Sequence, residues 1–198
     1  MFDPCSWIFI FVFGIAFVLS VAFSIFKVRI TNKYFNAKCL QLYEEDLRKY
    51  NFSMDDSIED IAKKLGKKIE YTKTVREAYI GKKNPDVIHV NKSLSAERKN
   101  FAITHEFGHN LRGYPRKAAA RDRIRFLSKL SPEEQICDYY AAAILLPIDD
   151  LNKKMQEKDF DNLSHNSQAK FIRDIAKNKC IMEDVVYRRI SEIKMLNR

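Results

Sequence analysis

The first 26 residues differ from the rest of the chain in their pattern of hydrophobic and polar positions. Residues 7–26 are almost entirely apolar and carry no charge, whereas charged side chains recur throughout the sequence that follows. At about 1.5 Å per residue, a helix of this run would cross the roughly 30 Å hydrocarbon core of a bilayer. Lys27 and Arg29 follow it, and basic flanks stay on the cytoplasmic side. The pattern predicts a single-pass anchor that contacts the lipid bilayer through residues 7–26, with the C-terminal domain in the cytoplasm.

A cleaved secretory signal peptide is the alternative interpretation of this apolar run. Signal peptides begin with basic residues and have a shorter apolar segment. Asp3 is the one charged residue before the run. The pattern therefore favours an uncleaved anchor.

Helical periodicity dominates the charged part of the chain. The helices expected from it cover residues 35–50, 57–65, 95–112, 131–146, 149–158, 166–177 and 182–196. Alternation of apolar and polar side chains predicts strands at residues 67–73 and 86–91. The expected fold class is α+β, with a small, mostly antiparallel sheet, several helices and one preceding transmembrane helix.

Composition narrows the possible classes of protein. The chain has 35 Lys and Arg against 26 Asp and Glu, and its four cysteines form no CxxC pair, which excludes a zinc ribbon or a thioredoxin-type motif. Basic side chains are densest after the 95–112 helix, at Arg116, Lys117, Arg121, Arg123 and Arg125. They could meet lipid, an acidic partner or nucleic acid. A solvated surface is the simpler explanation, so direct nucleic-acid binding is not expected.

The residues THEFGH at positions 104–109 carry the strongest chemical signal. His105, Glu106 and His109 stand in the spacing HExxH. Residues i and i+4 of a helix share a face, so the two imidazoles can bind one Zn²⁺. The carboxylate of Glu106 can then accept a proton from water that zinc has acidified. The motif predicts one zinc ion per chain and a hydrolytic reaction.

A hydrolytic zinc site needs a third protein ligand, and the helix expected over residues 131–146 offers one. Glu134 and Asp138 are four residues apart. Glu134 can therefore bind zinc while Asp138 accepts the other N–H of a ligating histidine. Two alternatives stay open: Glu133 could be the ligand instead, and Ser131 with Glu134 could form a capping box.

The sequence resembles the ImmA/IrrE family of zinc metallopeptidases over about residues 57–190. The resemblance rests on VIHVN at 87–91, on FAITHEFGH at 101–109, and on the pattern E-x-x-x-D-Y-Y-A-A-x-x-L-L-P that begins at Glu134. Members of that family often cleave or antagonise helix-turn-helix repressors. The resemblance implies a zincin-like HExxH helix and a protein substrate, such as a helix-turn-helix transcriptional repressor.

The same resemblance implies roles for individual residues. It makes His105, His109 and Glu134 the zinc ligands and Glu106 the general base. The family segment reads roughly E-x-E-A-N-x-F, and this chain differs from it at Ile136, Cys137, Asp138 and Tyr140. Loss of the family's second Glu favours Glu134 as the ligand.

Four further residues have both a functional and a structural interpretation. His89, Tyr139 and Tyr140 could contact the substrate or stabilise an oxyanion, although packing in the core explains each of them as well. Cys137 could offer a thiolate to zinc, but a small buried side chain is the simpler interpretation.

These observations predict a membrane-anchored, cytoplasm-facing zinc metalloendopeptidase. Its domains are expected to be an anchor at 1–29, a juxtamembrane helical linker at 30–56 and an ImmA/IrrE-like metallopeptidase domain at 57–198. The strand at 86–91 is expected to pair with an extended substrate. The alternatives are a non-catalytic zinc-binding regulator that sequesters a transcription factor or binds DNA, and a zinc hydrolase of non-peptide substrates.

Overall fold

The computed structural model describes residues 36–74, 76–81, 84–112 and 132–197. It confirms the expected α+β class. The helices are α2 (Ala37–Arg48), α3 (Ile58–Lys64), α4 (Ala96–Leu111), α5 (Pro132–Leu145), α6 (Ile148–Glu157), α7 (His165–Lys179) and α8 (Glu183–Leu196), with a 3-10 turn, η1, at Phe160–Asn162. The strands are β1 (Lys68–Thr72), β2 (Ala78–Ile80) and β3 (Val87–Asn91). The periodicity of the sequence predicts each of these helices, and β1 and β3, but not β2.

The described sheet is mixed, so the expectation of a mostly antiparallel sheet is wrong. Its strand order is β1-β3-β2; β3 pairs with β1 in parallel and with β2 antiparallel. Alternation of side chains determines which face of a strand is buried, but it does not determine strand direction. Both edges of β3 are paired, so the expectation that residues 86–91 receive a substrate strand is also wrong.

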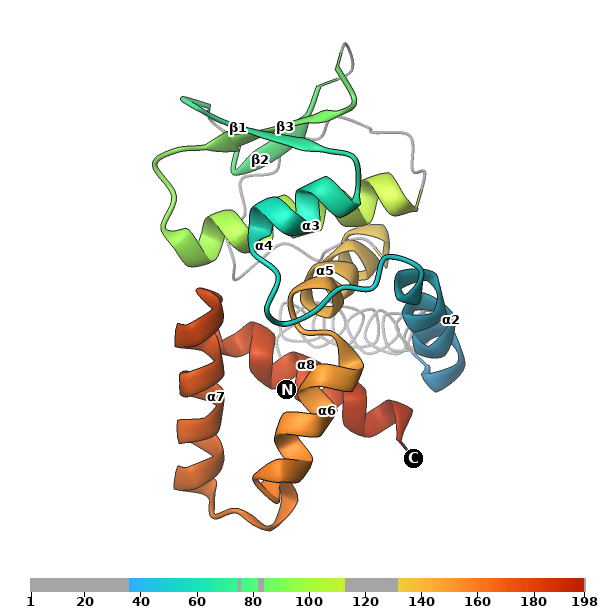
Figure 1. Ribbon diagram of the computed structural model, residues 1–198, viewed down its shortest axis with the longest axis vertical. Helices are drawn as coiled ribbons and strands as arrows, with labels where there is room; N and C mark the ends of the chain where they lie inside the picture. The colour runs from blue at the N-terminus through green and yellow to red at the C-terminus, as the bar shows by residue number, and fades with distance from the viewer. Residues whose placement is uncertain (1–35, 75, 82–83, 113–131, 198) are drawn as a thin grey trace, which may run out of the picture.

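The sheet forms one end of the molecule, and α4 lies directly beneath it (Figure 1). Ile88 and Val90 of β3 are fully buried, and side chains alternate along a strand. They therefore face the core, whereas His89 lies on the opposite face of the sheet. Helix α5 packs against α4, and α6, α7 and α8 form the other end of the molecule (Figure 1).

Local capping determines where α3 and α4 begin. Ser57 and Asp60 form a reciprocal capping box at the start of α3, and Gly66 (φ +64°) follows that helix in a left-handed conformation. The side chain of Ser95 accepts a hydrogen bond from the backbone N–H of Arg98 at the start of α4. The Ser95 cap stabilises the start of α4, the helix that carries the HExxH motif.

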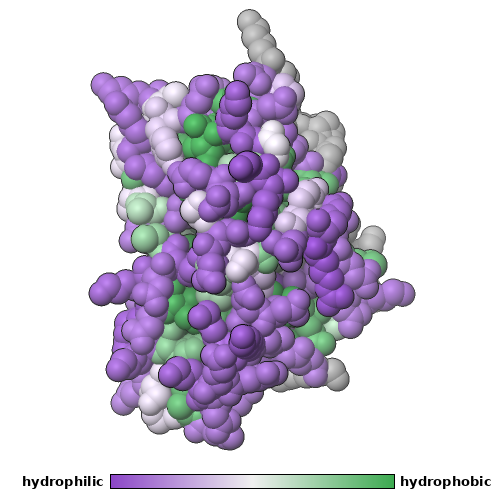
Figure 2. Space-filling model, viewed as in Figure 1, coloured by the Kyte–Doolittle hydropathy of each residue, from purple (hydrophilic) through white to green (hydrophobic). Residues whose placement is uncertain are grey.

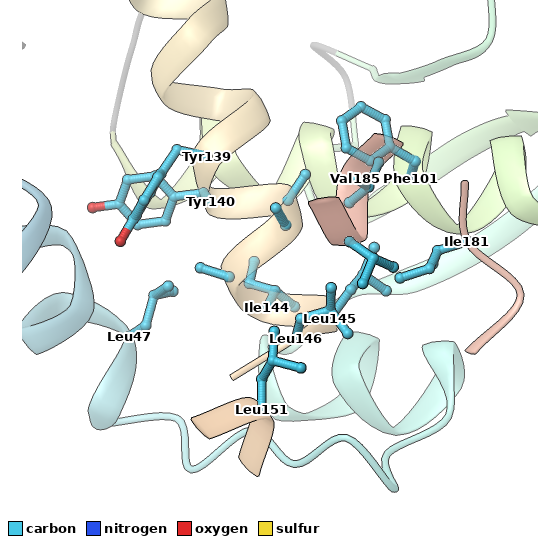
Figure 3. Packing of buried hydrophobic residues seen from close by; sticks show 14 of the residues in the cluster. Leu47, Phe101, Tyr139, Tyr140, Ile144, Leu145, Leu146, Leu151, Ile181 and Val185 are labelled. Carbon is cyan, nitrogen blue, oxygen red and sulfur yellow. The ribbon is translucent and has the colours of Figure 1, made fainter. Parts of the chain in front are cut away.

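Helix α5 is the centre of the hydrophobic core. Every residue from Ile136 to Leu146 is buried, as expected for a helix that is enclosed on all sides. Figure 3 shows Tyr139 and Tyr140 on one side of α5 and Phe101 with Val185 on the other. The face of the molecule shown in Figure 2, by contrast, is mostly hydrophilic, with small apolar patches. Helix α2, which the sequence assigns to a linker, packs Leu40, Tyr43 and Leu47 into this core.

The helices that the structure describes contradict the predicted localisation as a single-pass membrane protein. None of them is long and apolar enough to cross a bilayer. Helix α4, with 16 residues, is shorter than the roughly 20 that a span requires, and it carries charged side chains. The expected lipid contact at residues 7–26 lies outside the described residues, as do the basic positions from Arg116 to Arg125.

Candidate metal centre

The two histidines of the HExxH motif project from the same face of α4. Their Nε2 atoms are 3.2 Å apart, and the two rings meet edge to face. His105 is almost completely buried, and His109 is half-buried. The spacing of four residues produces this pairing because one helical turn brings the side chains together.

Helix α5 supplies a carboxylate to the same point. Glu134 Oε2 is 3.2 Å from His105 Nε2, and Glu134 Oε1 is 3.6 Å from His109 Nε2. The potential ligand atoms of these three residues all lie within 4.8 Å of one another. We call His105, His109 and Glu134 the metal cluster.

The donor set and the spacing of the metal cluster fit Zn²⁺. At Zn–N and Zn–O distances of about 2.0–2.1 Å, ligand atoms at the corners of a tetrahedron stand roughly 3.3–3.4 Å apart. The separation of His105 Nε2 from His109 Nε2 and that of His105 Nε2 from Glu134 Oε2, both 3.2 Å, are close to that value, and one ligand atom from each of the three residues lies within 4.8 Å of the others. Two imidazoles and one carboxylate are also a common zinc donor set with one open position.

Asp138 orients the first histidine. One turn beyond Glu134 on α5, its Oδ1 lies 2.7 Å from His105 Nδ1. A carboxylate can only accept, so Nδ1–H is the donor and the lone pair of Nε2 points into the metal cluster. The structure thus brings Asp138 to the position that the sequence predicts for it.

Gly108 allows α5 to approach this closely. A Cβ atom at Gly108 would stand 3.0 Å from both the Cα and the carbonyl oxygen of Cys137. Cys137 is fully buried at this helix contact. Burial, with the negative charges of Glu134 and Asp138, raises the pKa of its thiol far above the usual value. Cys137 therefore packs between the helices as a neutral thiol.

The remaining residues that the sequence singles out occupy different places. Glu106 is half-buried on α4, directly after His105. Glu133 is half-buried and is not among the residues of the metal cluster. Ser131, the possible cap, lies outside the described residues.

Three of the possible substrate contacts lie away from the metal cluster. His89 stacks on Tyr79, with ring centroids 4.9 Å apart, and its Nδ1 is 3.5 Å from Glu70 Oε2. Tyr139 and Tyr140 are fully buried, and their hydroxyls donate to Glu44 and Asp46 of α2. Their surroundings are those of structural side chains.

Sequence reasoning missed two arginines of α8. Arg189 is fully buried and pairs with Glu44 at 2.8 Å, while Arg188 pairs with Asp138. The sequence pattern does indicate that Arg189 is buried. Arg189 falls on the apolar stripe formed by Val185, Val186 and Ile193, and a charged residue on such a stripe is buried with a partner.

The chain is similar to a known protein family and to a solved structure. The model of the IrrE N-terminal-like domain matches residues 67–171. No curated protein matches the sequence. A solved structure described as a Mycobacterium tuberculosis transcriptional regulator is similar, with a TM-score of 0.52 and 11% identity over 82% of this chain and 51% of that one. This chain thus spans about half of that protein, and the likeness at this identity concerns the fold. Because the domain model covers more than half of the 198 residues, HExxH motif included, this chain belongs to the IrrE N-terminal-like domain family.

Proposed function

We propose that this chain is a zinc metallopeptidase that cleaves a regulatory protein. The observation that carries the proposal is the convergence of ligand atoms from His105, His109 and Glu134, which all lie within 4.8 Å of one another. Membership of the family supports the same reaction. The metal cluster also combines ligands from two helices that are separated in the sequence.

Each residue of the site has a distinct task in this proposal. His105, His109 and Glu134 hold the zinc, and Asp138 keeps His105 in the tautomer that presents Nε2. A bound zinc ion supplies Lewis-acid activation of water and of the scissile carbonyl. Glu106 takes the proton of the attacking water and returns it to the leaving amine.

The proposed substrate class is a transcriptional regulator such as a helix-turn-helix repressor. Two observations support it: the family to which the chain belongs, and a similar fold in a protein described as a transcriptional regulator. A regulator with an exposed, extended segment fits a zinc site that acts on peptide bonds.

A second candidate is a non-catalytic zinc-binding regulator that sequesters a transcription factor or binds DNA. The similar solved structure favours it, because that protein is described as a regulator and not as a peptidase. In this case the metal cluster would stabilise the packing of α4 on α5, and Glu106 would be dispensable.

The test compares protein termini in cells that express the wild type, Glu106→Gln or Glu97→Gln. Glu97 is exposed in the first turn of the same helix, so its substitution is a matched control. Zinc content is measured for each purified protein. We expect Glu106→Gln to retain zinc and to lose cleavage by about 10²–10⁴-fold, the usual contribution of a general base.

The outcomes separate the candidates. Termini that disappear in Glu106→Gln but persist in Glu97→Gln identify a peptidase and its substrates. Retained zinc with termini that do not respond to Glu106→Gln favours the non-catalytic regulator. A wild-type protein that binds no zinc contradicts both.

A further inference from the structure

Helix α8 contacts Asp138, the neighbour of His105, through Arg188. This helix begins at Glu183, beyond the residues that match the family model. The Nη2 atom of Arg188 donates a hydrogen bond to the backbone carbonyl of Asp138, and its Nη1 atom lies 3.8 Å from Asp138 Oδ2. Arg188 thus contacts both the main chain and the side chain of the residue that orients His105.

The two carboxylate oxygens of Asp138 have different neighbours. Oδ1 lies 2.7 Å from His105 Nδ1, while Oδ2 faces Arg188. A carboxylate held at both oxygens has less freedom to rotate about its terminal torsion, which is otherwise broad. The Asp138 side chain is 11% exposed and that of Arg188 is 39% exposed, so the pair lies at the edge of the protein interior and is partly screened by water.

Arg188 is itself held in place by neighbouring charges. Its Nε lies 3.3 Å from Glu192 Oε1, one turn further along α8. Glu192 Oε2 in turn lies 3.6 Å from Arg189 Nη1, and Arg189 pairs with Glu44 of α2. Arg188 therefore belongs to a series of charged side chains that extends along α8 to Glu44 of α2.

We propose that Arg188 is a positioning residue for the zinc site: it fixes the Asp138 carboxylate so that Oδ1 stays on His105 Nδ1. This inference rests on the proposed function, since it concerns His105, one of the proposed zinc ligands. It extends the site to α8, a helix outside the matched domain. Residue 138 is an aspartate, and a carboxylate can pair with an arginine.

The test is a double-mutant cycle read out as zinc affinity. Zn²⁺ is titrated against a chromophoric chelator for the wild type, Arg188→Met, Asp138→Ala and the double variant. Loss of an outer hydrogen-bond partner lowers metal affinity about 10–100-fold, which we expect for Asp138→Ala because it removes the acceptor of His105 Nδ1–H. One step further from the metal, Arg188→Met should cost roughly three- to tenfold.

The double variant distinguishes positioning from a separate effect. If Arg188 acts through the carboxylate, removing it from Asp138→Ala adds little, so the double variant matches Asp138→Ala within about twofold. Multiplicative losses would overturn the proposal, as would unchanged affinity in folded Arg188→Met. Arg188→Lys keeps the charge and should recover part of the affinity; it also replaces Arg188→Met if that variant does not fold.

Two controls complete the design. Arg173→Met removes the same charge from an exposed position on α7, and we expect it to leave zinc affinity unchanged. An equal loss in Arg173→Met would show a general charge effect and overturn the positioning role. Wild-type protein that binds no zinc removes the proposed function and this inference together, whereas normal zinc binding with an insensitive Arg188 removes this inference alone.

Discussion

Two polar clusters lie on different sides of α5, and they are balanced in different ways. The first is the metal cluster of His105, His109 and Glu134. The second, which we call the ion-pair cluster, joins α2, α5 and α8 and consists of Glu44, Tyr139, Arg189 and Glu192. Both are largely withdrawn from water.

The ion-pair cluster contains its own counter-charge. Arg189 Nη1 lies 2.8 Å from Glu44 Oε1 and 3.2 Å from the Tyr139 hydroxyl, and Arg189 Nε donates to the carbonyl of Leu146 at 3.0 Å. The metal cluster instead directs two imidazole nitrogens and a carboxylate toward one point. A buried charge needs a compensating partner; the protein supplies it in the ion-pair cluster, whereas the metal cluster has a donor set that fits a cation.

The largest expected effect is the loss of zinc affinity when a residue of the metal cluster is replaced. His109→Ala removes one of three zinc ligands, so zinc affinity should fall by more than the roughly 10–100-fold that loss of an outer partner causes. Chelator competition measures it. His165→Ala, at an exposed position that starts α7, is the control. Equal affinities in both variants would contradict the ligand assignment.

Breaking the ion-pair cluster should destabilise the fold without changing the metal site. Arg189→Met leaves Glu44 buried and uncompensated, so the free energy of unfolding should drop by about 3–5 kcal/mol. Urea denaturation measures the loss. Adding Glu44→Gln should recover part of it, because both charges are then gone. A loss below about 1 kcal/mol would show that Glu44 is compensated without Arg189.

Gly108→Ala tests how closely the helices that bear the metal cluster must approach. The added Cβ would press on the Cys137 backbone at 3.0 Å, at an expected cost of about 1–3 kcal/mol. Zinc affinity should fall too, because Glu134 is displaced from the histidines. Asn110→Ala on the same helix is the control. Thermal unfolding with and without zinc gives both quantities.

The smallest expected effect concerns a single hydroxyl. Tyr140→Phe removes the 3.0 Å hydrogen bond to Asp46 Oδ2 and should lower the free energy of unfolding by about 0.5–1.5 kcal/mol. Zinc affinity should not change, because the hydroxyl faces α2. A weaker affinity for zinc would instead connect Tyr140 to the metal cluster.

The sequence by itself determined the features that depend on near neighbours along the chain. His105 and His109 pair because one turn of helix separates them. Ser57 and Ser95 cap their helices because the groups they bind lie three residues ahead. Glu134 and Asp138 share a face for the same reason of helical period, so their joint approach to the histidines was predictable once α5 was placed.

Only the tertiary structure decided the features that depend on which elements meet. β2 has three residues, too few for a period, and its pairing on the far side of β3 determined that the sheet is mixed. The sequence allowed Tyr139 to face either the zinc site or the core. In the structure its hydroxyl pairs with Glu44 and Arg189, so it lies in the core. No pattern in the sequence joins Glu44 to Arg189 or Asp138 to Arg188, because contacts between distant segments arise from packing, which local periodicity does not encode.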